Sequence, residues 1–210
     1  HGGGGVEFMD ARPERIRAGC VAHARHGTTT LLPTTLAASP ELTLRMIRAV
    51  RQAQAATTEC TIAGVHLEGP FLSPAQSGAQ SPDALSLPTP GLWDRLLDEW
   101  PGGVRIMGAA PELPGAMALG EALRARGVVA SIAHSDADYE TCRRALACGF
   151  TDITHIYSGC SMVRRKNGYR FGGVVEAGLL EDAFTVQVIA DGKHLPPELL
   201  RLIVKCKGAD

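Results

Sequence analysis

Four side chains that can bind a metal or move a proton occur at equivalent places in this sequence. Glu68 follows the apolar, β-type segment 60–67 and precedes Gly69-Pro70, which cannot continue a regular strand. Histidines follow three further segments of this kind, 128–133, 150–154 and 184–190, and they are His134, His155 and His194. A carboxylate at the end of a buried strand is costly unless a cation or a metal is its partner.

One glutamate with two or three histidines can hold a divalent metal and leave a position for water. Such a metal lowers the pKa of its water and polarises a carbonyl, so the pattern predicts hydrolysis of an amide or an ester. A single histidine or glutamate of this kind is usually a hydrogen-bonded loop residue, but four in successive units favour a shared site. Asp136 and Asp191 are available as general bases, although neither directly ends a strand. A strand after Asp210 is the natural place for that base.

Strand and helix patterns alternate along the whole chain. Strands are expected at 28–32, 60–67, 104–109, 128–133, 150–154 and 184–190. Helices are expected at 13–25, 40–57, 92–100, 117–126, 139–148, 174–180 and 196–204, the one at 139–148 capped by Ser135 or Asp136. The segments 71–90 and 157–173 read as long loops, which in compact domains are usually functional or mobile.

Apolar strands that alternate with helices predict a parallel sheet buried on both faces. We expect a (β/α)8 TIM-type barrel with the four side chains on the rim at the carboxyl ends of its strands. A doubly wound Rossmann-type sheet fits less well. No G-x-G-x-x-G turn follows the first strand, and polar candidates recur after nearly every strand.

The ends of the chain indicate a truncated barrel. The sequence begins with His1 instead of Met, before four glycines, and it ends at Asp210 where another strand is due. The expected strands therefore correspond to strands 2–7, and residues 1–210 form one incomplete barrel domain without a second domain. A barrel without strands 1 and 8 leaves two unpaired edges, so this piece alone is expected to be inactive.

Composition excludes several functional classes. The chain has 210 residues, 45% of them hydrophobic and 20% charged, with a formal net charge of -1. It has no basic excess that would suggest nucleic acid, no apolar run long enough for a membrane, and no signal peptide. Its six cysteines include no C-x-x-C pair, which favours reduced, structural thiols in a cytoplasmic protein.

Several motifs, in chain order, resemble those of the N-acetylglucosamine-6-phosphate deacetylase family in the amidohydrolase superfamily. They are LPT at 32–34, HLEGPF at 66–71, AHSDA at 133–137, THIY at 154–157 and ADGKH at 190–194. The resemblance implies a Zn- or Fe-dependent hydrolase with one or two ions, acting in amino sugar metabolism. It would convert N-acetylglucosamine 6-phosphate to glucosamine 6-phosphate and acetate, and it would be a cytoplasmic homodimer.

The resemblance also implies roles for particular residues. Glu68, His134 and His155 would be metal ligands. His1 falls where some members carry the second histidine of an H-x-H pair that helps to hold a second metal. Gln80 would contact substrate, and glutamine at that place accompanies the H-x-H type. The catalytic aspartate of the family lies on strand 8, so no catalytic base is expected within this sequence.

Phosphate binding is expected from His194 and from the loop after His155. That loop carries Ser158-Gly159-Cys160 where the family often has Asn-Ala-Met, so the sugar or its phosphate would be handled differently. Arg164 and Arg165 lie nearest the family's phosphate-binding arginine, which a dimer partner contributes. Their alternative interpretation is a solvated charge run.

Two other functions remain open. The Ser158-Gly159-Cys160 change is compatible with another amidohydrolase, acting on an N-acyl amino acid or a cyclic amide. The chain could also be a non-catalytic barrel remnant that binds without turnover. Measuring metal content would distinguish a non-catalytic barrel remnant from either enzyme. Comparing activity on N-acetylglucosamine 6-phosphate with activity on the unphosphorylated sugar would distinguish the deacetylase from the other amidohydrolase.

Overall fold

The computed structural model describes residues 1–208. The helices are α1 (Pro13–Ala24), α2 (Pro40–Ala56), α3 (Pro90–Asp98), α4 (Ala116–Ala125), α5 (Tyr139–Ala147), α6 (Val174–Leu180) and α7 (Pro197–Lys207). The strands are β1 (Gly2–Gly3), β2 (Val6–Glu7), β3 (Thr30–Leu31), β4 (Thr61–Ile62), β5 (Val65–Phe71), β6 (Val104–Ala109), β7 (Val129–Ile132), β8 (Phe150–Ile153), β9 (Arg164–Lys166), β10 (Tyr169–Phe171) and β11 (Thr185–Val186). The expected helices are all present, whereas the expected domain end at Asp210 and the strand after it lie outside the described residues.

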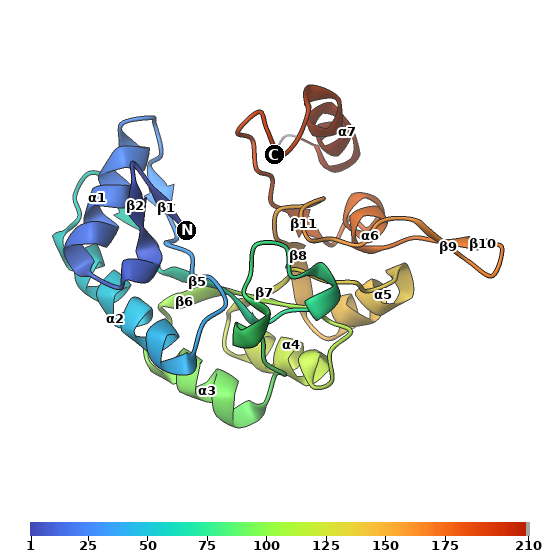
Figure 1. The fold of residues 1–210 in the computed structure, drawn as a ribbon, viewed down its shortest axis with the longest axis horizontal. Helices are drawn as coiled ribbons and strands as arrows, with labels where there is room; N and C mark the ends of the chain where they lie inside the picture. The colour runs from blue at the N-terminus through green and yellow to red at the C-terminus, as the bar shows by residue number, and fades with distance from the viewer. Residues whose placement is uncertain (209–210) are drawn as a thin grey trace.

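The sheet is parallel and its strands follow one another in sequence order. The main sheet has the order β11-β8-β7-β6-β5, and β3 pairs in parallel with β4. A parallel bridge between Thr34 and His66 joins the two sheets. A doubly wound sheet reverses its strand order at a switch point, so this sequential order excludes the Rossmann-type alternative. The chain forms an open arc, with the β1–β2 hairpin and α7 at its two ends (Figure 1).

The strand expected at 60–67 is divided into two and extends farther than predicted. β4 pairs with β3, and Gly64, at φ +138°, turns the chain toward β6. A Cβ at Gly64 would lie 2.3 Å from the Gly103 carbonyl oxygen, so the position requires glycine. β5 then continues through Gly69 to Phe71, with a register shift against β6 after Glu68. The prediction that the strand ends at Glu68 is therefore wrong, because the shift accommodates Gly69-Pro70 within the strand.

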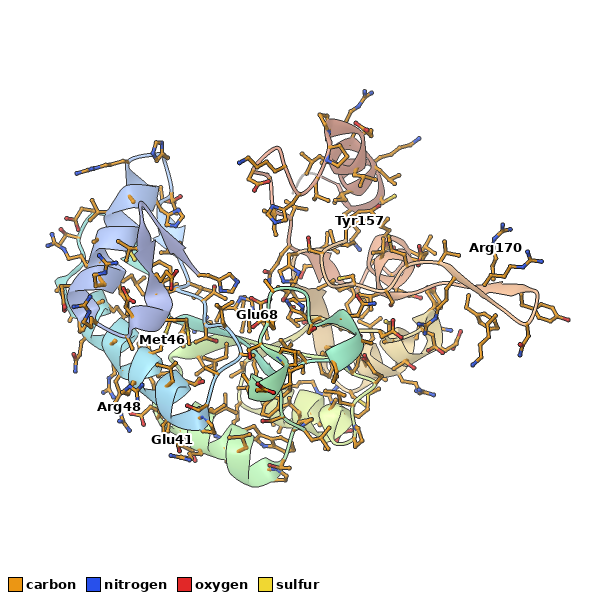
Figure 2. The ribbon with its side chains drawn as sticks, in the orientation of Figure 1. Glu41, Met46, Arg48, Glu68, Tyr157 and Arg170 are labelled. Carbon is orange, nitrogen blue, oxygen red and sulfur yellow. The ribbon has the colours of Figure 1, made fainter. Side chains whose placement is uncertain are left out.

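The loop expected at 157–173 contains a hairpin. β9 and β10 pair antiparallel, and Asn167 and Gly168 form the turn with φ of 51° and 86°. Asn-Gly is the preferred dipeptide for two-residue hairpin turns, so the sequence carried a signal for this element. The hairpin projects from the body of the molecule, with Arg170 on β10 (Figure 2). The strand expected at 184–190 is also shorter than predicted and is limited to β11.

The N-terminal caps of α2 and α5 are provided by side chains just before each helix. Ser39 caps α2 by accepting a hydrogen bond from the Leu42 backbone N–H, and Pro40 occupies the first turn. α5 is capped by Asp138, which accepts from the Thr141 N–H, and not by Ser135 or Asp136 as predicted. Ser135 and Asp136 lie before the helix and instead form hydrogen bonds with Glu112.

The thiols are all free, in agreement with the sequence. Burial raises the pKa of Cys20, Cys142 and Cys160 to about 12, so these three are inert side chains of the core. Within the part of the chain that the structure describes, no helix combines the length and the apolar character needed to cross a membrane.

A buried polar network joins β7, β8 and β11 inside the sheet. The Asp152 carboxylate accepts hydrogen bonds from the Ser131 hydroxyl (2.6 Å), the Thr185 hydroxyl (2.8 Å) and the Gln187 amide (2.7 Å). Ser131 also contacts the Thr154 hydroxyl at 2.6 Å. Because the three donors share one acceptor group, they lose their partner together if that group is removed.

Replacing Asp152 by alanine is therefore expected to lower the free energy of unfolding by about 1–3 kcal/mol, because it removes hydrogen bonds to a charged acceptor, one of them from the buried Ser131 hydroxyl. Urea denaturation monitored by circular dichroism measures the change. The matched control is Asp182→Ala, the same substitution at an exposed position. Equal stability of the two variants would contradict a structural role for the Asp152 network.

Candidate metal centre

Three of the predicted residues converge on one point. The Oε1 atom of Glu68 lies 2.7 Å from the Nε2 atom of His134 and 2.7 Å from the Nε2 atom of His155. The potential ligand atoms of these residues all lie within 4.8 Å of one another, and the two imidazole rings meet edge to face. Glu68 is 1% exposed and lies near the middle of the arc (Figure 2).

His1 joins the same group from the other end of the chain. Its Nε2 atom lies 2.7 Å from the Oε2 atom of Glu68, and its Nδ1 atom lies 3.3 Å from the Thr34 carbonyl oxygen. The two histidines from β7 and β8 therefore face one carboxylate oxygen, and His1 faces the other. This arrangement would suit a carboxylate shared by two metal positions, one beside each oxygen.

The local backbone explains why these side chains point inward. The Glu68 N–H donates to the buried Thr35 hydroxyl at 3.1 Å, which holds β5 where its register shifts. His134 and His155 lie two residues after the ends of β7 and β8, with positive φ values of 43° and 33°. Non-glycine residues seldom adopt this conformation, and it concentrates at functional sites. The sharp turn after each strand directs both imidazoles toward Glu68.

Contacts around His134 indicate which ring nitrogen could bind a metal. The Gln76 carbonyl oxygen, which can only accept, lies 2.8 Å from Nδ1, so Nδ1 carries a proton. Nε2 is the nitrogen that faces Glu68, to which it donates while protonated, and it is the atom that could bind a metal once that proton is lost. A Cβ on Gly159 would lie 2.7 Å from this Nδ1, and Gly159 has φ +58°. Glycine in Ser158-Gly159-Cys160 thus allows the loop after His155 to pack directly against His134.

Electrostatics of the group favour an ionised carboxylate. Burial alone would raise the pKa of Glu68, but its hydrogen bonds with His1, His134 and His155 hold that pKa well below its usual range. Burial lowers the pKa of His134 and of His1, yet the contact with Glu68 outweighs it and raises both above their ordinary value. A metal must displace those protons, so metal affinity is expected to fall as the pH decreases.

His66 belongs to the surroundings of the site, although the sequence interpretation assigned it no role. It precedes Glu68 by two residues on β5, so both side chains lie on one face of the strand. The residue is 5% exposed, and its Nε2 atom has no hydrogen-bond partner among the described residues. Burial lowers the pKa of its imidazole to about 4. The alternation in His66-Leu67-Glu68 was the signal that could have identified it.

The predicted substrate residues are divided between the site and its periphery. Gln80 is buried, and its Oε1 atom accepts the Ala37 N–H at 2.7 Å, so it ties the loop after β5 to the chain after β3. The Ser158 N–H donates to the His155 carbonyl at 2.9 Å. Arg164 forms an ion pair with Asp136 at 2.7 Å, and Arg165 is exposed on β9.

His194 does not join the Glu68 group. It is exposed, and its Nδ1 atom lies 2.8 Å from the Asp191 carboxylate, which also accepts the backbone N–H groups of Lys193 and His194. These bonds hold the pKa of Asp191 well below its usual range. The two aspartates that sequence analysis considered as bases are therefore engaged, Asp191 by His194 and Asp136 by Arg164 and Gln76.

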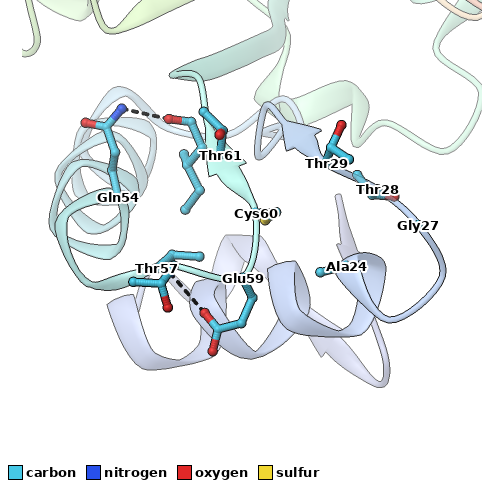
Figure 3. A pocket seen from close by; sticks show the side chains of 11 residues that line it. Ala24, Gly27, Thr28, Thr29, Gln54, Thr57, Glu59, Cys60 and Thr61 are labelled. Carbon is cyan, nitrogen blue, oxygen red and sulfur yellow. Dashed lines mark hydrogen bonds between the residues drawn. The ribbon is translucent and has the colours of Figure 1, made fainter.

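A pocket of about 580 Å³ lies elsewhere, at the amino ends of β3 and β4 (Figure 3). Its lining is rich in threonine, including Thr28, Thr29 and Thr61. The carboxylate at its edge, Glu59, is already paired with Arg17 at 2.6 Å. The pocket lacks a convergent set of titratable groups, so the chemistry points to the Glu68 group instead.

Comparisons with known proteins agree with the motif resemblance. Residues 5–208 match the amidohydrolase family. N-acetylglucosamine-6-phosphate deacetylase of Lysinibacillus sphaericus is 32% identical, over 100% of this chain and 54% of that protein. N-acetylgalactosamine-6-phosphate deacetylase of Shewanella sp. (strain ANA-3) is also 32% identical, over 100% of this chain and 52% of that protein.

Solved structures give the same result. N-acetyl-D-glucosamine-6-phosphate deacetylase from Mycobacterium smegmatis matches with a TM-score of 0.88 and 37% identity, over 99% of this chain and 57% of that one. A mutant of that enzyme in complex with N-acetyl-D-glucosamine-6-phosphate matches with a TM-score of 0.88 and 36% identity, over 98% and 52%. The chain thus spans about half the length of the relatives it matches.

Proposed function

Because the chain belongs to the amidohydrolase family, we propose that the protein is a metal-dependent deacetylase of N-acetylated amino-sugar phosphates. N-acetylglucosamine 6-phosphate is the proposed substrate, and glucosamine 6-phosphate and acetate are the products. The observation that carries this proposal is the convergence of His134, His155 and His1 on the two carboxylate oxygens of Glu68. The relatives and the structure with bound sugar phosphate support the substrate class.

The donor set suits a divalent metal. A buried carboxylate and two imidazole Nε2 atoms that face it match the ligands and the open position of a hydrolytic zinc site, and iron also suits imidazole. Glu68, His134 and His155 would hold one ion, and His1 together with Glu68 would help to hold a second. A bound metal supplies an activated water and polarises the acetyl carbonyl.

The residues of this chain would then orient the substrate and the ligands. Gln76 fixes the tautomer of His134 through its carbonyl, and the tight packing of Gly159 keeps the ring in place. His194, held by Asp191, presents its Nε2 atom to solvent and would bind the 6-phosphate together with an arginine. Asp136 and Asp191 are engaged by other groups, so we place the general base on a strand beyond this sequence.

The arginine that meets the phosphate is expected to come from a second copy. Arg164 is held by Asp136, whereas Arg165 is exposed on the projecting β9–β10 hairpin. A hairpin that leaves its own subunit in this way (Figure 2) can reach a neighbouring one. We therefore propose a homodimer of barrels, in which residues 1–210 supply strands 2–7 of one barrel domain in the cytoplasm.

A second candidate is the 4-epimer of the substrate. Two of the relatives, from Escherichia coli O157:H7 and Shewanella sp. (strain ANA-3), are N-acetylgalactosamine-6-phosphate deacetylases with 30% and 32% identity. These values equal those of the N-acetylglucosamine-6-phosphate enzymes. Overall similarity therefore does not separate the two sugars, and the activity measurement below includes both.

The test uses the natural-length protein, with its metal content measured by plasma mass spectrometry. Acetate release is followed with N-acetylglucosamine 6-phosphate, its 4-epimer and unphosphorylated N-acetylglucosamine. We expect kcat/KM to be highest for a phosphorylated sugar, to vanish when the metal is removed with a chelator, and to return with zinc. Turnover of an N-acyl amino acid without turnover of either sugar phosphate would favour the other amidohydrolase chemistry. A protein without metal and activity would indicate a non-catalytic barrel.

A further inference from the structure

β6, which lies between β5 and β7 in the sheet, contributes to the metal site in a different way from its neighbours. β5, β7 and β8 each bring a side chain to the Glu68 group, and β6 brings none. The chain after β6 instead carries Glu112, which reaches across to the segment that follows β7. Its Oε2 atom accepts the Ser135 hydroxyl at 2.7 Å, and its Oε1 atom accepts the Asp136 N–H at 2.6 Å.

Both oxygens of Glu112 are used by the two residues directly after His134. Two short hydrogen bonds from one carboxylate fix position and direction together, and bonds to an ionised acceptor are stronger than neutral ones. Ser135 is fully buried, and its hydroxyl oxygen also accepts the Ala137 N–H at 3.1 Å. Glu112 therefore holds the start of this segment, while the loop after His155 holds it from the other side.

The contacts on that other side are between backbone groups. The Ser135 N–H donates to the Gly159 carbonyl at 2.9 Å, and the Ser161 N–H donates to the Ser135 carbonyl at 3.0 Å. His134 itself has φ 43°, a conformation that non-glycine residues retain only where the surroundings hold them. The backbone after His134 is thus fixed by β6 on one side and by the loop after β8 on the other.

We propose that Glu112 is a positioning residue for His134. It fixes the left-handed turn after β7, so that the Nε2 atom of His134 faces the Glu68 carboxylate before a metal binds. This inference rests on the proposed metal-dependent function. Glu112 does not bind the metal itself, because its two oxygens are occupied by Ser135 and Asp136 and it lies outside the ligand group.

The test is Glu112→Gln in the natural-length protein. The amide keeps the shape but has no charge and only one acceptor oxygen. That oxygen can still accept the Asp136 N–H, while the NH2 group faces the Ser135 hydroxyl, which must then accept and loses its bond to an ionised carboxylate. We expect the dissociation constant for zinc, measured by competition with a chromophoric chelator, to rise roughly 10- to 100-fold, the usual effect of losing such a supporting group. The visible spectrum of the Co²⁺-substituted protein should also change, because the ligand geometry changes. Glu121→Gln, the same substitution on the exposed face of α4, should change neither.

A second variant guards against a failure to fold. Ser135→Ala removes one of the two bonds to Glu112 and should give a smaller rise in the zinc dissociation constant. If both variants melt at a lower temperature but bind zinc and Co²⁺ like the unsubstituted protein, Glu112 has only a structural role and the inference is wrong. If the unsubstituted protein itself binds no metal, the proposed function is wrong, and the positioning role is lost with it.

Discussion

Replacing Glu68 by glutamine is expected to raise the dissociation constant for zinc roughly 100- to several-thousand-fold. This range corresponds to about 3–5 kcal/mol, the cost of removing one charged partner from a buried group of charges. Glu68 is the shared anion of the group, since His1, His134 and His155 all contact its carboxylate. Glutamine has the same shape as glutamate but no charge, so the loss of zinc affinity measures the contribution of the charge. Zinc competition titrations and metal analysis after dialysis measure it.

The same titrations provide the control. Glu121→Gln changes the same atoms on the surface of α4 and should retain the full zinc content. Circular dichroism of Glu68→Gln should keep the native spectrum, so that lost affinity is not lost folding. Retention of stoichiometric zinc with unchanged affinity in a folded Glu68→Gln protein would refute the assignment of this residue as a ligand.

Replacing His194 by alanine is expected to raise KM for N-acetylglucosamine 6-phosphate roughly 10- to 150-fold. The range follows from about 1.5–3 kcal/mol for a hydrogen bond to a charged group. His194 is exposed, and Asp191 occupies its Nδ1 atom, so the Nε2 atom is the one available to a phosphate. Phosphate sites in barrels often use the loops after the last strands. The effect should appear mainly in KM, with metal content unchanged.

Two comparisons make this prediction specific. His26→Ala, at an exposed position beyond α1, should leave KM unchanged. With unphosphorylated N-acetylglucosamine, His194→Ala should have little effect, because the phosphate contact is already absent. Loss of metal on this substitution, or an equal effect on both sugars, would show that His194 acts on the metal or on the fold and not on the phosphate.

Local patterns were sufficient to identify the elements and the residues at the centre. Apolar periodicity placed each helix within a few residues of its position, and alternation of strand and helix predicted the parallel sheet. Because parallel strands end at one edge of a sheet, the positions of His134 and His155 after their strands indicated that they meet Glu68. The same reasoning also placed His194 with them, and that part was wrong, because His194 is paired with Asp191 outside the group.

Residues that contact one another across the fold could not be predicted in this way. Nothing local to Glu112 shows that it reaches the chain after β7, since its partners lie 23 and 24 residues away. Arg164 was one of two arginines considered for a phosphate contact, with a solvated charge run as the alternative, and its pairing with Asp136, 28 residues earlier, was not predicted. Such pairings depend on how neighbouring loops pack, and sequence spacing does not determine that packing.

The boundaries of β5 and β11 show the same limit. Gly69-Pro70 is a strong signal for ending a strand, yet β5 continues to Phe71 because the neighbouring strand β6 accepts a shifted register. Conversely, 184–190 is apolar over most of its length but pairs as a strand only at Thr185–Val186. Side-chain chemistry and strand direction could be inferred from neighbours along the chain, whereas register and the contacts that hold His134 in place were decided by partners that only folding brings together.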